Sequence, residues 1–244
     1  MSDGERLDIL LARNLGCSRA AARALVQDGG LVAGGVPLTN PREAISAARL
    51  PLAASVDGVE RRLYDRVRVL LNKPPGCVTA LRDPRHPTAY ALLREAPLHA
   101  ELRPVGRLDL ETTGLLLWTN DGSEIQRLTH PRRAVPRTYQ AALSRPFEPL
   151  PPTLRLDDGH EPNVLGLGEL PRNQAHPSLA VPPESALLAS ITIGGGAYHE
   201  VRRIFAALGS HVLGLCRVGF GRLALPPDLP VGGYRLIDSL QGQA

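Results

Sequence analysis

Asp109 is a charged residue at a position where the surrounding pattern does not require a charge. It lies in the stretch RPVGRLDLETTGLLLWTNDG, residues 103–122, shortly before an apolar run that is typical of a buried strand. If residues 104–109 are extended, Arg107 and Asp109 point to the same side, with Cα atoms about 7 Å apart. A guanidinium that close keeps a carboxylate ionised even when the carboxylate is partly buried. Asp109 would then lie on a loop between ordered elements, which is a common place for a functional group.

The spacing around Asp109 leaves more than one interpretation open. An ion pair between Arg107 and Asp109 that only fixes the loop explains the pattern, and such pairs are common. Asp109 and Glu111 could also be the two carboxylates of a glycosidase, although nothing in the sequence indicates a raised pKa for either. Spacing alone therefore favours the structural ion pair.

Turn and cap signals define the elements that would hold this loop. Residues 112–114 turn the chain into the strand LLLWT, and Asn120-Asp121-Gly122 ends that strand. Ser123 and Gln126 have the spacing of a capping box, which predicts a helix after the turn.

The first sixty residues predict a compact helical unit followed by a hairpin. Leucines in residues 5–15 share one helical stripe, and Gly16 is a natural stop just beyond it. Ser18 is a good N-cap for a second helix, RAAARALVQ, and Gly29 and Gly30 end that helix. The segment that follows alternates like short strands around a Gly34-Gly35 turn.

The rest of the chain mixes strand-like runs with a few short helices. Residues 50–65 have the character of a connector, and residues 67–71 alternate like a half-buried strand that stops at Pro74-Pro75-Gly76. Residues 146–185 are rich in proline and are read as strands with long loops. The predicted fold class is α+β, with a small domain at residues 1–60 and a larger domain with a mostly antiparallel mixed sheet at residues 61–244.

Composition and charge narrow the class of partner. The 244-residue chain carries a net charge of +4, and Lys73 is its only lysine, so nearly all of its positive charge is guanidinium. Arginine forms bidentate contacts with phosphate and stacks on bases, which makes a nucleic-acid partner plausible. Arginine usage can also reflect genomic base composition, so charge alone does not decide the question. No apolar run approaches the ~20 residues of a membrane helix, and the start lacks a signal-peptide pattern, which predicts a cytoplasmic protein that does not bind membranes.

Neither cysteine nor histidine spacing indicates a metal site. The three cysteines are far apart and lack a CxxC motif. The segment HEVRR at His199 begins like a zinc-protease helix, but Arg203 stands where the second histidine would be needed. We expect neither a metal nor a cofactor.

Four ordered motifs resemble one enzyme family over most of the chain. GRLDLETTGLLLWTNDG looks like the signature of the pseudouridine synthases of the ribosomal small-subunit type and related large-subunit types. Three supporting segments occur in the family's order: LLNKPPGCVTALRDPRHPT, LTHPRRAVPRTYQAAL and ITIGGGAYHEVRRIFAALGSHVLGLCRVGFGRLAL. The order RLD, SR, G and a hairpin at the start resembles an S4 RNA-binding domain. The segment DPRHPT and the chain length look closest to the enzymes that act on 16S ribosomal RNA.

The resemblance implies a mechanism and a set of residues. The reaction breaks the glycosidic bond of a uridine, rotates the uracil and joins C5 to the ribose, without a metal or cofactor. Asp109 would be the nucleophile, and attack at C1′, attack at C6 and elimination to a glycal all remain open. Tyr139 would stack on the flipped uracil, Arg202 would pair with the aspartate, and Val201 would pack under the base. Arg107 would help to keep Asp109 charged, and Arg203 could replace Arg202 as the pairing partner.

Two departures from the family pattern concern RNA contacts. The usual lysine of the KTY motif is Arg137, and the EGRYHQ pattern becomes GGGAYHE, with Glu200 where a glutamine is expected.

The expected partner is ribosomal RNA or a ribosome assembly intermediate, bound by a monomer. A base inside folded RNA must be extruded before the reaction, so flanking phosphates must be held. The candidates for these contacts are Arg6, Arg19, Arg23, Lys73, Arg132, Arg133 and Arg137. The competing interpretations are a synthase acting on 23S ribosomal RNA and a noncatalytic S4-type ribosome-assembly factor.

Overall fold

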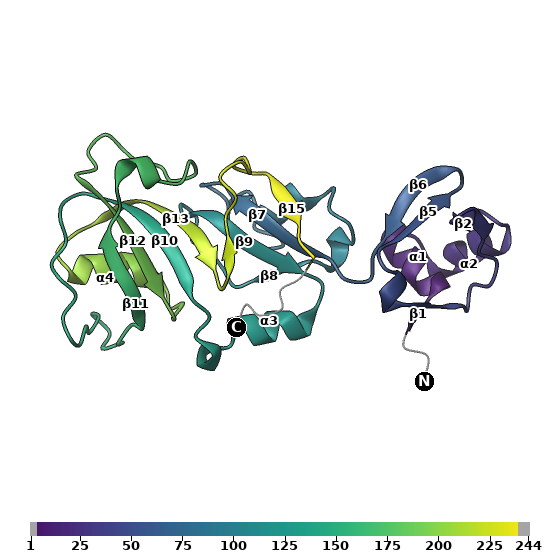
Figure 1. Ribbon diagram of the computed structural model, residues 1–244, viewed down its shortest axis with the longest axis horizontal. Coiled ribbons are helices and arrows are strands. Elements are labelled where there is room, and N and C mark those ends of the chain that lie inside the picture. The colour runs from purple at the N-terminus through teal and green to yellow at the C-terminus, as the bar shows by residue number, and fades with distance from the viewer. Residues whose placement is uncertain (1–3, 239–244) are drawn as a thin grey trace. The chain divides into compact units, whose positions relative to one another are not determined.

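The chain divides into two compact units in the computed structural model, which describes residues 4–238 (Figure 1). Unit 1 contains residues 4–67 together with Ala96–Leu102, and unit 2 contains residues 68–95 and 103–238. The division therefore follows Val67, whereas the sequence pattern placed it at residue 60. Position 60 lies inside a strand, Val59–Leu63, so the connector expected at residues 50–65 is in fact ordered structure.

Unit 1 packs two helices against short strands around one apolar core. Helix α1 ends at Gly16, which adopts the left-handed conformation (φ 64°), and the Ser18 side chain accepts a hydrogen bond from the Ala21 amide at the start of α2. Both helix boundaries agree with the predicted cap signals, and the stripe leucines Leu7, Leu10 and Leu11 are fully buried. The elements are β1 (Gly4–Arg6), α1 (Leu7–Leu15), α2 (Arg19–Gln27), β2 (Leu31–Ala33), β3 (Val36–Pro37), β4 (Ala44–Ser46), β5 (Leu52–Val56) and β6 (Val59–Leu63), with a 3-10 turn at Ala47–Arg49.

Within the described residues, unit 2 is built on a nine-stranded mixed sheet. Seven strands follow the order β11-β12-β10-β13-β9-β7-β15, while β8 pairs with β9 and β14 with β13. The pairing of β9 with β13 is parallel and the others are antiparallel, which confirms the predicted α+β class with a mostly antiparallel sheet. The strands are β7 (Arg68–Lys73), β8 (Arg103–Val105), β9 (Thr113–Thr119), β10 (Arg137–Leu143), β11 (Val164–Glu169), β12 (Leu187–Ile193), β13 (Val212–Phe220), β14 (Leu223–Ala224) and β15 (Tyr234–Leu236).

Two helices flank this sheet, α3 (Gly122–Thr129) beside β8 and β9 and α4 (Glu200–Ala207) beside β13 (Figure 1). The N-cap of α3 is Asp121, whose carboxylate accepts hydrogen bonds from the amides of Ser123 and Glu124, so the predicted Ser123–Gln126 capping box is wrong. Aspartate in the preceding turn satisfies the same free amides. Short 3-10 turns lie at Ala89–Leu93, His99–Glu101, Pro131–Arg133 and Arg172–Gln174.

The parallel pairing at the centre of the sheet depends on one glycine. Gly114 lies opposite Arg217 and has φ 100°, and a Cβ atom there would come within 2.3 Å of the Arg217 carbonyl oxygen. The chain therefore approaches β13 this closely only because residue 114 has no side chain. This contact places the end of the 106–112 loop beside β13.

The proline-rich segment 146–185 contains a single described strand, β11, and one 3-10 turn. The expected strands with long loops are thus mainly loops. No described helix has the length and apolar character that crossing a membrane requires.

Candidate active site

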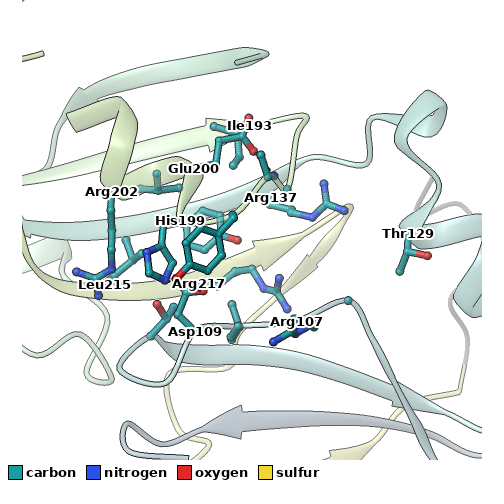
Figure 2. Close-up of a pocket in the computed structure, with 18 residues that line it drawn as sticks. Arg107, Asp109, Thr129, Arg137, Ile193, His199, Glu200, Arg202, Leu215 and Arg217 are labelled. Atoms are coloured by element: carbon teal, nitrogen blue, oxygen red, sulfur yellow. Dashed lines mark hydrogen bonds and ion pairs between the residues drawn. The ribbon is translucent and has the colours of Figure 1, made fainter. Parts of the chain in front are cut away.

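A cavity of about 410 Å³ in unit 2 gathers all the predicted catalytic and supporting residues except Arg203 (Figure 2). Its wall combines the loop that carries Asp109, the neighbouring strands β10 and β13, and the start of α4. The predicted site residues that line it are Arg107, Asp109, Arg137, Tyr139, Val201 and Arg202, while His199, Glu200 and Arg217 line it as well.

The Asp109 loop is held by the segment 73–79, which belongs to the first of the supporting motifs. The Gly76 amide donates to the Leu110 carbonyl at 3.0 Å. The Thr79 hydroxyl donates to the Leu108 carbonyl and accepts from the Leu108 amide, both at 3.1 Å. These bonds flank Asp109 on both sides, so the carboxylate is presented from a fixed backbone.

Lys73 completes this support from a buried position. Its ammonium group donates to the carbonyl oxygens of Pro74, Leu110 and Thr112 at 2.9 to 3.0 Å, and the side chain is fully buried. Burial lowers the pKa of Lys73, and electrostatic interactions with Cys77, Glu111 and Asp109 oppose that shift. Because an ammonium group has three donors and all three are used, the predicted phosphate contact of Lys73 does not fit the structure. A structural role does fit.

Asp109 meets a histidine rather than the expected arginine. β8 ends at Val105, and Gly106 has φ 77°, so the extended conformation assumed for residues 104–109 is wrong. Arg107 is exposed, and within residues 4–238 the basic side chain found within 4.0 Å of the Asp109 carboxylate is His199, whose Nε2 lies 3.7 Å from Oδ1. The Asp109 side chain is 35% exposed, so it remains open to the cavity.

His199 is a site residue that the sequence analysis missed as such. It precedes α4 with φ 51°, and its ring stacks on that of Tyr198 with centroids 3.8 Å apart. Its position two residues before Val201 was the available signal, but the sequence pattern was used to consider His199 only as a zinc ligand. Figure 2 shows His199 among the side chains that surround Asp109.

Tyr139 and Arg217 lie side by side on adjacent strands. They are register partners on β10 and β13, and both are nearly inaccessible to solvent, at 8% and 1% exposed. Tyr139 thus lies in a strand and also lines the cavity. Arg217 was not identified from sequence because it stands in an otherwise apolar strand.

The two adjacent arginines on α4 have different surroundings. Arg202 lines the cavity, and its Nη1 donates to the Val212 carbonyl at 3.1 Å. Arg203 instead pairs with Asp157 and Asp158 outside the cavity. Neither arginine approaches Asp109 within 4.0 Å, so the expected ion pair is not formed. Of the two, Arg202 is the one that lines the cavity.

The altered segment GGGAYHE folds back on itself at the rim of the cavity. The Glu200 carboxylate is buried, accepts from the Ala197 amide at 2.9 Å and pairs with His160 at 3.0 Å. A Cβ atom on Gly195 would lie 2.4 Å from this carboxylate, so the glycine makes room for it. The Arg137 guanidinium donates to the carbonyl oxygens of Gly195 and Val135.

The remaining predicted RNA contacts fall into two groups. Arg132 and Arg133 are exposed on the 3-10 turn after α3, where Arg133 helps line a smaller cavity with Arg127 and His130. In unit 1, Arg6, Arg19 and Arg23 all donate to the buried carboxylate of Asp8 at 3.0 to 3.1 Å. Their side chains remain 36% to 46% exposed, so each guanidinium still faces solvent.

Within residues 4–238, there is no group of three or more histidine, cysteine, aspartate or glutamate side chains that could hold a metal ion.

Comparisons with known proteins agree on one family. The family described as RNA pseudouridylate synthase matches residues 67–207. "Ribosomal small subunit pseudouridine synthase A" of Yersinia pestis is 34% identical, with 94% of this chain and 93% of that protein covered. The protein of the same name from Escherichia coli strain K12 is 33% identical, with coverages of 94% and 95%. An uncharacterized RNA pseudouridine synthase of Bacillus subtilis is 32% identical, with coverages of 94% and 93%.

A solved structure described as a pseudouridylate synthase has 28% sequence identity and a TM-score of 0.56, with 96% of each chain covered. This agreement extends over both units. With the family match over residues 67–207 and relatives above 30% identity over nearly the whole length, it establishes that the chain belongs to the RNA pseudouridylate synthase family.

Proposed function

We propose that this enzyme converts a uridine of small-subunit ribosomal RNA to pseudouridine, with Asp109 as the nucleophile. The observation that carries the proposal is the presentation of Asp109, which is one-third exposed in a cavity while the backbone on both sides of it is pinned. A nucleophile needs both features, because a free carboxylate on a mobile loop would lose the geometry of attack. The small-subunit substrate is inferred from the names of the relatives.

The other cavity residues have roles that suit this chemistry. Tyr139 presents a buried ring on the sheet and would stack against the flipped uracil, with Val201 packing against the base. Arg202 would swing from the Val212 carbonyl toward Asp109 or a phosphate when RNA binds, and until then His199 would be the basic side chain beside Asp109. Arg203 has its charge matched at Asp157 and Asp158, which argues against a direct role.

RNA binding would be shared by both units. Arg6, Arg19 and Arg23 form an array in an S4-like domain around one shared carboxylate, Asp8, so the array keeps an excess of positive charge. Such an array suits phosphates of structured RNA. Arg132 and Arg133 would hold the backbone near the target base, while Arg137 would contribute from the cavity wall. We further propose that the protein acts as a monomer in the cytoplasm, where its RNA substrate is found.

The test measures tritium release from RNA labelled at uridine C5. The wild-type protein is expected to release tritium from 16S ribosomal RNA or from small-subunit assembly particles, and mapping the product would give the modified position. Release from 23S ribosomal RNA only would replace the proposed substrate. Tight RNA binding without release from any substrate would instead support a noncatalytic assembly factor.

A further inference from the structure

Arg217 is a buried cation whose hydrogen-bonding capacity is not used up by the protein. Its side chain is 1% exposed, and its Nε donates to the Leu115 carbonyl at 2.7 Å. Its Nη2 is buried and has no hydrogen-bond partner in the part of the chain that the structure describes. Unpaired buried donors of this kind are rare because they lose their hydration without compensation.

The surroundings of Arg217 add a second positive charge instead of a counter-ion. The guanidinium groups of Arg217 and Arg137 both lie over the Phe220 ring, at 5.3 and 5.5 Å from its centroid. Burial lowers the pKa of Arg137 and the nearby charge of Arg217 lowers it further, while electrostatic interactions with Tyr139 and Glu200 oppose that shift. Among residues 4–238, neither guanidinium has a carboxylate within 4.0 Å.

A structural explanation accounts for only part of this arrangement. The bond from Nε to Leu115 helps to join β13 to β9, but a neutral side chain could make it. Keeping a charge out of water without an anion is costly. A negatively charged group of the substrate in the cavity beside Arg217 would both balance the guanidinium charge and accept a hydrogen bond from its free Nη2.

The chemistry of the proposed reaction supplies such a group. When the C1′–N1 bond breaks, its electron pair stays on the uracil and is shared among N1, O2 and O4. An oxygen of Asp109 bonds to C1′, or, on the glycal route, the H2′ proton leaves to a base. After the uracil rotates, C5 bonds to C1′ as the bond from Asp109 to C1′ breaks, or, on the glycal route, as C2′ regains a proton. The C5 proton is then lost and N1 gains a proton, so the product is an isomer of the uridine. Attack at C6 would likewise place negative charge on the ring and O4.

We propose that Arg217 is a catalytic residue that donates from Nη2 to a carbonyl oxygen of the uracil and stabilises the negative charge that develops on the base. The assignment rests on the proposed function, because it requires uridine in this cavity. Its position fits, since Arg217 is the register partner of Tyr139, the residue proposed to stack on the same base. A preorganised donor aimed at developing charge is among the largest contributions to catalysis.

A phosphate is the less suitable occupant. A phosphodiester joins two nucleotides and stays connected to a chain that runs over the protein surface. Arg217 is almost completely covered, beside the ring expected to face the base. A phosphate contact by Arg217 would chiefly affect the RNA dissociation constant, whereas a uracil contact would chiefly affect the reaction rate. Measuring both quantities therefore separates the two cases.

The experiment compares Arg217→Met with wild type in single-turnover reactions on RNA that carries uridine or 5-fluorouridine at the target position. Fluorine makes the departing uracil anion less basic, so it needs less stabilisation by the protein. With uridine we expect a rate loss of about 10²- to 10³-fold and an unchanged RNA dissociation constant. With 5-fluorouridine, followed by its disappearance from nuclease digests, the loss should be about tenfold smaller or less. Arg235→Met is the matched control, because Arg235 pairs with Asp228 and lies outside the cavity.

Arg217→Lys guards against a folding defect, since it retains a cation and a donor. If Arg217→Met loses its native melting transition, the lysine variant should fold and show a smaller defect with the same dependence on the leaving group. Equal losses on both RNAs, in whichever variant folds, would reduce Arg217 to a structural residue. Lost affinity with a normal rate would indicate a phosphate contact, and either result overturns the proposal. If the wild-type protein itself forms no pseudouridine, the proposed function fails first.

Discussion

Two aspartates in this chain lie near arginines, and their surroundings are opposite. Asp8, in unit 1, is fully buried and accepts hydrogen bonds from Arg6, Arg19 and Arg23. Burial alone would raise the Asp8 pKa, but the three guanidinium groups outweigh it and lower that pKa to about 2. Asp109, in unit 2, is 35% exposed, and among residues 4–238 the basic side chain within 4.0 Å of its carboxylate is His199, at 3.7 Å.

The difference separates a carboxylate that organises structure from one that is available to react. The oxygens of Asp8 are occupied by donors, so its charge serves to orient three arginines. Among residues 4–238, the oxygens of Asp109 have no such donors, while its backbone neighbours are held by Lys73 and Thr79. A reactive carboxylate needs a fixed backbone and a free head group, and only Asp109 combines them.

Replacing Asp109 should have the largest effect on activity and almost none on stability. We expect Asp109→Asn to lower the rate of pseudouridine formation by about 10⁴-fold or more, as loss of a nucleophile does. The free energy of unfolding should change by less than about 0.5 kcal/mol, because no protein donor is lost. Tritium release and thermal melting measure the two effects.

Glu111→Gln is the matched control for this variant, since Glu111 is an exposed carboxylate outside the cavity. It should retain a rate close to wild type. A comparable loss in both variants would revive the two-carboxylate mechanism that the sequence left open, and full activity of Asp109→Asn would end the nucleophile assignment.

The next largest effect should distinguish the adjacent arginines Arg202 and Arg203 by the reaction rates of their variants. Arg202→Met is expected to lower the single-turnover rate by about 10²-fold, because it removes a charge from the wall of the reaction cavity. Arg203→Met should change that rate by less than about threefold, since it removes a surface ion pair with Asp157 and Asp158. The reverse order would restore Arg203 as the pairing partner.

How far the sequence predicts this molecule depends on the range of the interactions. The caps at Gly16 and Ser18 are local signals, and the structure confirms both. The bonds from Lys73 to the Asp109 loop join residues 37 and 39 positions apart, and no local pattern specifies them. Strand-like runs mixed with short helical patterns predicted the α+β class, and the four ordered motifs predicted the pseudouridine synthase family.

The errors at the site have identifiable physical causes. Gly106 could have warned of a bend, because glycine readily adopts the positive φ that breaks the alternation of Arg107 and Asp109. Arg217 gave no such warning, since a single arginine in the run VLGLCRVGF resembles a solvated strand position. Its burial follows from the pairing of β13 with β10 and β9, which only the tertiary structure provides.

Lys73 offers a test of how much the fixed backbone contributes. Lys73→Met keeps the side-chain length but leaves three carbonyl oxygens without their donor. We expect a loss of about 3 kcal/mol in the free energy of unfolding and a rate about 30-fold lower at temperatures where the variant is folded. RNA affinity should stay unchanged if Lys73 makes no phosphate contact. A normal rate with weakened RNA binding would show that the phosphate contact predicted for Lys73 from the sequence was right.

The smallest effect is expected at Asp8, where the change should appear in stability and RNA affinity rather than in chemistry. Asp8→Asn removes the charge that three arginines share, so unit 1 should lose about 2 kcal/mol of stability and RNA should bind more weakly. The rate at saturating RNA should stay within about twofold of wild type. Hydrogen exchange in peptides covering α1 and α2 reports on unit 1 within the full chain, and Asp28→Asn, an exposed change after α2, is the control.

The pH dependence of hydrogen-exchange protection in α1 and α2 provides a further comparison between Asp8 and Asp109. The Asp8 pKa in the folded protein, about 2, lies below the unfolded value of about 3.9, so the unfolded state binds more protons between these values. The stabilisation by Asp8 is therefore complete above about pH 4 to 5 and declines as the pH falls toward about 2. Protection of α1 and α2 should decline over this range in wild type and in Asp109→Asn, and more weakly in Asp8→Asn. If Asp8→Asn kept the full wild-type decline, the arginines would not depend on Asp8 for their arrangement, and the contrast with Asp109 would rest on exposure alone.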